Sequence, residues 1–306
     1  MTADRLINLA AIVTLMELML TIGLGATVAD VLVVARDWRG FARALVANYV
    51  AVPAAAVGLV VLLHVPPMVA AGAMIVAVCP GAPYAPPFTA VVRGRVERAV
   101  GLMVILAGTS AVVAPLLLRL LLPLLAGAGQ ENVDAPKMLI TLAVVQFLPL
   151  CIGLSIARRR ADWARRLEVP LRRLSGVLNI GLIVIILVVQ FRMLASIQAR
   201  GYLGMLSLLA ASAVAGWLLE GGDAADRRTL AVTTSVRNVG VGLVIAGGSF
   251  PGTPAVTFTT AYALFQTVVT ALGAFAVRGL VAAPAATPAT TESSEISRTA
   301  KPAATV

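Results

Sequence analysis

The chain has 306 residues, of which 59% are apolar and 12% charged, with a formal net charge of +10 and a mean hydropathy of +0.95. Soluble domains carry about 25% charged residues, whereas the apolar runs here reach the ~20 residues that cross a bilayer. The composition excludes an ordinary soluble domain and predicts an all-α polytopic membrane protein.

Nine apolar segments are expected to cross the membrane as helices, joined by loops too short to hold a soluble domain. The first segment is expected to stay in place, because residues 1–5 lack the basic character of a cleaved signal peptide. The predicted spans are residues 7–27, 41–63, 68–92, 99–125, 138–156, 174–194, 203–219, 229–247 and 255–277.

The positive charge gathers in alternate loops, and the loops between them carry few basic residues. This asymmetry follows the positive-inside rule and predicts a cytoplasmic C-terminus and an outer N-terminus. The charge therefore indicates orientation in the cell's inner (plasma) membrane and does not favour a nucleic-acid partner. The basic loop residues are Arg36, Arg39, Arg43, Arg93, Arg95, Arg98, Arg158, Arg159, Arg160, Arg165, Arg166, Arg172, Arg173, Arg227, Arg228 and Arg278.

Two apolar stretches are interrupted near their centres. Residues 79–87 read CPGAPYAPP, and residues 233–242 read TTSVRNVGVG. The four prolines of the first stretch exclude an unbroken helix. Backbone groups freed inside a membrane must be buried in protein or line a watery cavity. A pair of such breaks in two halves of a chain indicates the binding site of a secondary transporter.

The sequence gives little support for a disulfide framework, a metal site or an enzyme active site. Cys79 and Cys151 lie in apolar spans without the spacing of a disulfide framework or a metal site, and we expect no cofactor. The spans hold no aspartate pair, histidine or His-Glu-x-x-His motif, so we expect that the chain is not an enzyme. Residues 282–306 are rich in Ala, Pro, Thr and Ser, which predicts a disordered cytoplasmic tail.

Five short motifs follow one another in a recognisable order. They are residues 48–53 (NYVAVP), 79–81 (CPG), 92–95 (VRGR), 115–117 (PLL) and 236–238 (VRN).

In these motifs, from about residue 23 to residue 276, the chain resembles the bile acid:sodium symporter family. The resemblance implies inverted repeats that form a core and a panel domain, with the two broken helices crossing in the core near the bilayer midplane. Gly23 and Leu24 match the glycine motif of the second span in ten-span relatives. We therefore expect a nine-span transmembrane domain at 1–281, with a first repeat lacking one helix at 7–125 and a second at 138–277.

The sodium ligands that the resemblance implies are altered around the first break. Relatives carry Ser-Asn after the CPG motif, where this chain has Ala85 and Pro86. The downstream Ser and Thr positions hold Ala99 and Met103. Sodium needs several oxygen ligands, so the resemblance does not carry the usual sodium sites over to this chain.

The second break is altered in the same direction. Where relatives have Glu-x-Gly-x-Gln-Asn, Thr233 replaces the glutamate and Arg237 the glutamine. Asn238, and Asn48 at a position where relatives hold glutamine, keep amide oxygens. A guanidinium in this position could stand in for the bound ions.

Arg237 is the most unusual residue inside a predicted span, where a charge must face a cavity or a partner. It could contact an anionic substrate through its planar guanidinium, or form a structural ion pair, or cap carbonyls of the broken helix. The candidate substrate-binding residues are Arg237, Asn238, Asn48, Thr233, Ser235, Pro80, Gly81 and Tyr84.

Glu17 is the acid in the interior of a predicted span. It could pair with Arg237, titrate and couple transport to protons, or be solvated near the outer surface. Arg119 is expected to reach the membrane interface, and His64 to be solvated in a loop. Further polar residues could line a cavity or bond across helices: Gln146, Asn179, Gln190, Tyr262 and Gln266.

These features favour a secondary transporter of small organic anions, working by alternating access of core against panel in the lipid bilayer. Two alternatives remain open. One is an oxyanion or arsenite-type efflux carrier, since such relatives carry a cysteine near the place of Cys79. The other is a membrane sensor or scaffold that does not transport.

Overall fold

The structure is a computed structural model that describes residues 3–126, 134–195 and 197–280. Within these ranges the chain forms helices and connecting turns without strands, which confirms the all-α fold. The predicted tail at 282–306 lies outside the described residues. The helices are α1 (Ala3–Gly25), α2 (Val28–Arg36), α3 (Trp38–Val46), η1 (Ala47–Ala51), α4 (Val52–Leu62), α5 (Pro67–Ala77), α6 (Ala85–Val91), α7 (Val96–Ala126), α8 (Ala135–Leu142), η2 (Ala143–Phe147), α9 (Leu148–Arg159), α10 (Ala161–Ala195), α11 (Ala199–Leu219), α12 (Ala224–Ser235), α13 (Val239–Ser249) and α14 (Pro254–Leu280).

The apolar helices match the predicted spans in position. Within the described ranges, eight helical segments are long and apolar enough to cross a membrane, and α5 is a shorter apolar helix. Each predicted span overlaps one such segment, except that residues 68–92 form the pair α5 and α6 on either side of a break. The chain is thus a multi-pass membrane protein.

The helix α2 did not follow from the apolar pattern, which left its residues in a loop. Thr27 and Asp30 form a capping box at its start: the Thr27 hydroxyl accepts from the Asp30 backbone, and the Asp30 carboxylate accepts from the Thr27 backbone. Such a box satisfies backbone donors that the first turn leaves free. Local capping therefore stabilises a helix that connects α1 to the rest of the bundle.

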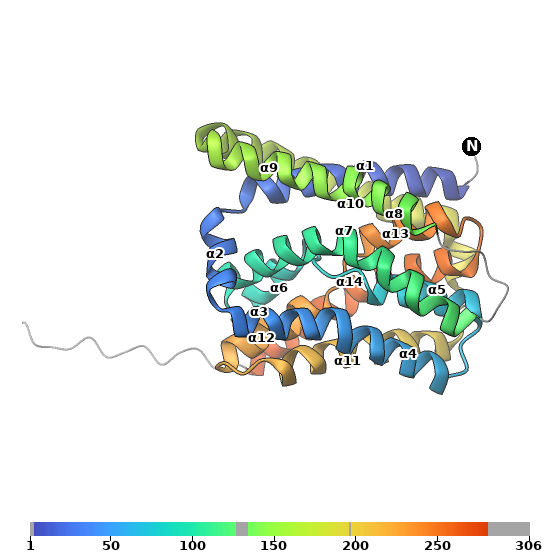
Figure 1. Cartoon of the computed structure of the whole chain (residues 1–306). Coiled ribbons are helices and arrows are strands. Elements are labelled where there is room, and N and C mark those ends of the chain that lie inside the picture. The colour runs from blue at the N-terminus through green and yellow to red at the C-terminus, as the bar shows by residue number, and fades with distance from the viewer. Residues whose placement is uncertain (1–2, 127–133, 196, 281–306) are drawn as a thin grey trace, which may run out of the picture.

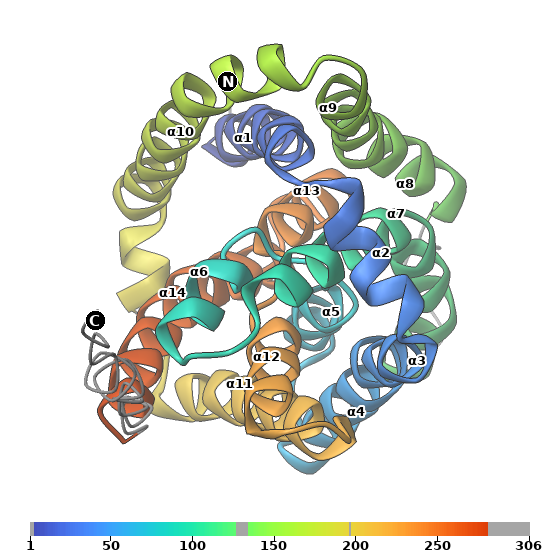
Figure 2. The ribbon, with the colours of Figure 1, turned by 90° about the vertical axis from the view of Figure 1, so that its left-hand side faces the viewer.

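The helices form two groups that face each other (Figures 1 and 2). In one group α1 packs against α9 and α10; in the other α3 to α7 pack with α11, α12 and α14. The helix α13 contacts α1, α5 and α14 and so lies where the groups meet. This division has the form of the panel and core that the family resemblance implies, and we use those names for the two groups.

The panel depends on a close approach of two helices at glycines. A Cβ atom added at Gly23 would lie 2.4 Å from the Leu150 carbonyl oxygen, and one added at Gly153 would lie 2.4 Å from that of Leu20. Real Cβ atoms do not come so close, so α1 and α9 can touch only through these glycines. The Gly23-Leu24 motif thus has a packing role.

Candidate functional site

The two breaks lie against each other, as predicted for residues 80–87 and 235–240. The Asn238 backbone N–H donates to the Cys79 carbonyl at 2.8 Å, and the Asn238 side-chain amide donates to the Gly81 carbonyl at 3.3 Å. Figure 1 shows α5 and α13 toward one end of the bundle and α6 and α12 toward the other. Four half-helices therefore meet at one place inside the core.

The first break ends earlier in the chain than expected. The α-helix stops at Ala77 and resumes at Ala85, so Pro86 and Pro87 lie in the first turn of α6 and not in the break. First-turn residues have no intrahelical N–H partner to lose, which makes proline acceptable there. The prediction that the break extends through residue 87 was wrong for this reason.

Gly81 lies within the break in a backbone conformation that favours glycine, with φ of +82°. A Cβ atom at this position would also lie 2.3 Å from the Ala107 backbone nitrogen of α7. The break can therefore pack against α7 only without a side chain at residue 81.

We expect Gly81→Ala to lower the free energy of unfolding by about 2–4 kcal/mol, from the unfavourable φ and the overpacking together. Denaturant unfolding in detergent measures it. The matched control is Gly58→Ala in α4, where an added Cβ meets nothing within 4 Å; alanine there should be neutral or stabilising by up to about 1 kcal/mol. Equal stability of the two variants would contradict the role assigned to Gly81.

The second break spans residues 236–238 and is held by side-chain amides. The Gln266 amide brackets the Arg237 backbone: its Oε1 accepts from the Arg237 N–H at 2.7 Å, and its Nε2 donates to the Arg237 carbonyl at 3.0 Å. The Asn238 Oδ1 accepts from the Val241 N–H at 3.3 Å and caps α13. The break is thus a fixed structure with most of its backbone groups satisfied by protein.

The Arg237 side chain is 1% exposed and enters the core. Its Nη1 donates to Asn48 Oδ1 at 2.8 Å, while Nε and Nη2 are buried without a hydrogen-bond partner among the described residues. Across those residues no carboxylate lies within ion-pair distance of the guanidinium. The expectation of a structural ion pair was wrong, and the guanidinium makes no bond to a carbonyl of the broken helix.

Asn48, which the sequence suggested as a substrate-binding residue, is the hydrogen-bond partner of Arg237. It lies in the π-helical segment η1, and its Nδ2 donates to the Ala44 carbonyl at 2.9 Å and to Thr234 Oγ1 at 3.3 Å. Pro53 follows on the same helix and cannot donate an N–H, which is consistent with a local widening of the helix. The amide oxygen of Asn48 is thereby left to accept from Arg237.

The other predicted site residues divide into two sets. Thr233 and Ser235 are turned to their own helix, since their hydroxyls donate to carbonyls of α12. Pro80 is buried in the first break. Tyr84 is 37% exposed and lines a cavity together with Arg237 and Asn238.

That cavity has a volume of about 310 Å³ and lies between panel and core. The panel contributes residues of α1 and α10, among them Thr14, Leu18 and Asn179; the core contributes both breaks and α14. The cavity volume is at the small end of the range for ligand pockets.

Glu17 lies on the panel side and does not pair with Arg237, which overturns that expectation. Its Oε1 accepts from Thr21 Oγ1 at 2.8 Å and from Ser175 Oγ at 2.9 Å, while Oε2 is buried without a partner among the described residues. Of the remaining polar residues, Gln146 donates to the Ala107 carbonyl and to Ser110 in α7. Gln190 and the Tyr262 hydroxyl are buried and have no hydrogen-bond partner within the described ranges, whereas Arg119 and His64 are exposed.

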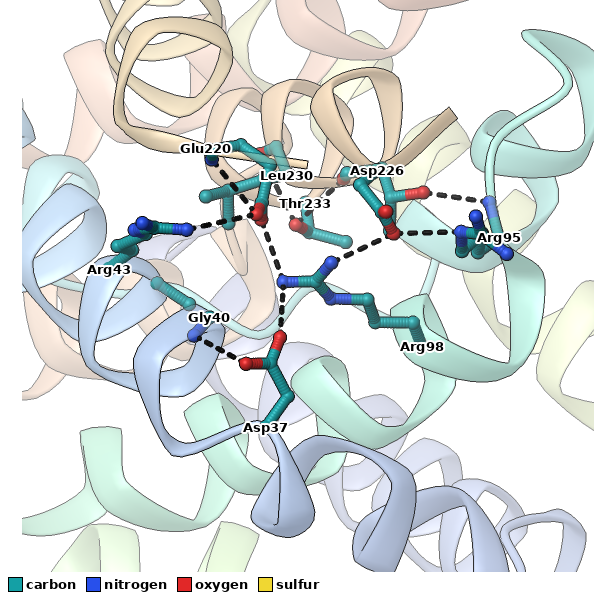
Figure 3. Close-up of polar contacts among 12 residues, drawn as sticks. Asp37, Gly40, Arg43, Arg95, Arg98, Glu220, Asp226, Leu230 and Thr233 are labelled. Carbon is teal, nitrogen blue, oxygen red and sulfur yellow. Dashed lines mark hydrogen bonds and ion pairs between the residues drawn. The ribbon is translucent and has the colours of Figure 1, made fainter. Parts of the chain in front are cut away.

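An ionic cluster at one end of the core was missed by the sequence reading (Figure 3). Arg98 of α7 lies at its centre and pairs with Glu220 at 2.7 Å, Asp226 at 2.8 Å and Asp37 at 3.5 Å. Glu220 is only 2% exposed. The full cluster comprises Asp37, Arg43, Arg95, Arg98, Glu220, Asp223 and Asp226.

This ionic cluster joins four helices of the core: the starts of α3, α7 and α12 and the end of α11. Asp37 also accepts from the Gly40 N–H at the start of α3, and Asp223 accepts from the Ala225 and Asp226 N–H groups at the start of α12. The pKa of Asp223 lies below its usual range, mainly because its carboxylate accepts a hydrogen bond from the Asp226 N–H, and to a smaller extent because of the nearby charge of Arg95. The sequence analysis used these arginines only to predict orientation. The acidic residues near the helix starts could have predicted that the arginines form ion pairs.

Comparison with known families agrees with this arrangement. The model of the Sodium Bile acid symporter family matches residues 12–197, well over half of the chain. The match includes Glu17, Asn48 and the first break and ends before the second break. No curated protein matches the chain.

Proposed function

The chain belongs to the Sodium Bile acid symporter family, and from this premise we propose that it is a secondary transporter of small organic anions that works by alternating access. Family membership and the apolar helices make it a membrane transporter of the bile acid symporter type. The substrate class and the mechanism are our proposal. We also propose that it lies in the plasma membrane with its C-terminus in the cytoplasm, on the strength of the loop charges.

The observation that carries the proposal is the buried guanidinium of Arg237, which has no carboxylate partner in the described part of the chain. An uncompensated charge inside a membrane protein is costly and is typical of ion and substrate pathways. Arg237 belongs to the wall of the cavity between panel and core. Its positive charge would favour an anionic group in that cavity, because Coulomb interactions are strong where water is excluded.

Direct contacts to that anionic group would come from the cavity wall. The start of α13 lies there, with Val239 and Gly240 in the lining, and helix N-termini favour anions. Tyr84 and Asn179 supply further polar groups. Movement of the core against the panel would then carry the site and its bound anion from one side to the other.

Transport without the usual sodium sites is supported by what fills their positions. Ala85, Ala99 and Met103 are buried apolar side chains, and the amide oxygen of Asn48 is occupied by Arg237. A sodium ion near this guanidinium would be repelled and would lack oxygen ligands. We propose that the fixed charge of Arg237 takes the place of bound sodium.

Replacing sodium by choline is therefore expected to change anion binding less than about twofold, because buried apolar side chains at Ala85, Ala99 and Met103 occupy positions of the family's sodium ligands. A thermal-shift screen of organic carboxylates and sulfonates, run in both salts, measures this, since a ligand that binds the folded state raises the melting temperature. A large, saturable sodium stimulation would contradict the proposal.

The oxyanion-carrier alternative gains no support from the site. Cys79 is fully buried, and its carbonyl accepts the Asn238 N–H that holds the breaks together. That is a structural position and not one from which a thiol meets a substrate.

A further inference from the structure

Glu17 in the panel resembles Arg237 in the core: each is a charged residue without an ion-pair partner among the described residues. It lies within the membrane-spanning part of α1. One carboxylate oxygen accepts two hydroxyl hydrogen bonds, from Thr21 and Ser175. The other is buried and has no partner among the described residues.

In the part of the chain that the structure describes, this carboxylate has no cationic partner. Over the described ranges, no lysine, arginine or histidine lies within ion-pair distance of Glu17. Arg237 is equally without a carboxylate, so the two opposite charges do not neutralise each other. Each is left to be compensated by something other than the protein, since unpaired buried charges are strongly destabilising.

Glu17 lies behind the panel wall of the cavity. Its neighbours on α1, Thr14 and Leu18, line the cavity. On α10, Gly176 and Asn179 line the cavity close to Ser175, the hydrogen-bond partner of Glu17. Asn179 donates through Nδ2 to the Ser175 carbonyl at 2.8 Å and lines the cavity together with Tyr84 of the first break. Glu17, Ser175 and Asn179 are therefore linked by hydrogen bonds on the panel side of the cavity, opposite the first break.

We propose that the substrate is zwitterionic: its anionic group is held at the second break near Arg237, and its cationic group is held on the panel side by Glu17. This inference rests on the proposed function and specifies its substrate class. A single small molecule with both charges would compensate both buried groups at once. It would also bridge panel and core, because Glu17 belongs to one group of helices and Arg237 to the other.

The test compares ligands that differ only in the cationic group. ω-Amino carboxylates from β-alanine to 6-aminohexanoate are paired with the simple carboxylates of equal chain length, and binding to the whole protein is measured by thermal shift or calorimetry. We expect at least one amino carboxylate to bind about tenfold to a hundredfold more tightly than its simple partner, because a hydrogen bond between charged groups has that effect. Glu17→Gln should abolish the preference and should not weaken binding of the simple carboxylate, because it removes a negative charge near the cavity.

Two further variants guard against a change in folding. Glu17→Asp keeps the charge and should retain part of the preference. Glu97→Gln removes an exposed acid outside the cavity and should leave the preference intact. Equal or tighter binding of the simple carboxylates in the wild type, or an unchanged preference in Glu17→Gln, would overturn the zwitterion inference. If the zwitterion inference fails but Arg237→Gln still weakens anion binding, the proposed function stands. If Arg237→Gln has no effect on anion binding either, the proposed function fails together with the zwitterion inference.

Discussion

Replacing Arg98 by methionine is expected to lower the free energy of unfolding by about 3–5 kcal/mol, because removing one member of a buried ion pair leaves its partner uncompensated. Arg98 is 11% exposed and pairs with three acids, of which Glu220 is the most buried. Arg43 remains for Glu220 only at 3.9 Å. Denaturant unfolding of the purified protein in detergent measures the loss.

Two comparisons define the origin of this effect. Adding Glu220→Gln to Arg98→Met removes the uncompensated carboxylate and should recover part of the stability. Arg165→Met is the matched control, since Arg165 and its partner Asp162 are 71% and 82% exposed. Exposed pairs contribute roughly 0–1 kcal/mol. A loss at Arg98 no greater than that at Arg165 would contradict the structural importance of the ionic cluster.

The second large effect concerns Arg237. Arg237→Gln is expected to weaken binding of organic anions by about tenfold to a hundredfold, since it removes the charge that the cavity offers to the anion. Arg237→Lys should restore only part of the affinity, because lysine keeps the positive charge but lacks the planar guanidinium that the Asn48 amide now positions. Calorimetry with the anions found in the thermal-shift screen measures both.

Asn48 provides a variant that neutralises Arg237 without removing it. Asn48→Asp places a carboxylate where Asn48 Oδ1 now accepts from Nη1 at 2.8 Å. The new pair should weaken anion binding as Arg237→Gln does. Because the substitution also removes the Nδ2 donor to the Ala44 carbonyl, denaturant unfolding is measured on the same protein to verify that it is folded. If anion affinity were unchanged in folded Arg237→Gln and Asn48→Asp proteins, the substrate role of this charge would be excluded.

Much of the fold could be predicted because membrane spans are signalled by simple properties. Long apolar runs gave the positions of the helices, and clustered prolines with glycine gave the place of the first break. The end of that break was set too late, at residue 87, because proline is compatible with a first helical turn as well as with a break. The helix α2 was missed because a capping box, and not an apolar run, starts it.

The sequence suggested candidate residues for the site but not their hydrogen bonds. Arg237 and Asn238 stood out as polar residues of the second break and Asn48 as an amide in another span, and the structure places Asn48 next to Arg237. Side-chain direction depends on helix rotation, so the sequence could not show that Glu17 faces Ser175 and not Arg237. The π-helical turn that positions Asn48 and the convergence of acids on Arg98 arise from tertiary packing and left no periodic signal.

Counterflow in liposomes tests the central claim most directly, because it detects exchange of a substrate across the membrane and separates a carrier from a scaffold. Liposomes that contain the protein and an unlabelled organic anion, identified by the thermal-shift screen, are diluted into a trace of the same labelled anion. We predict transient, saturable accumulation of label in sodium or choline salt, strongly reduced by Arg237→Gln. Absence of accumulation with folded protein and an anion that binds it, or equal accumulation by Arg237→Gln, would contradict the account.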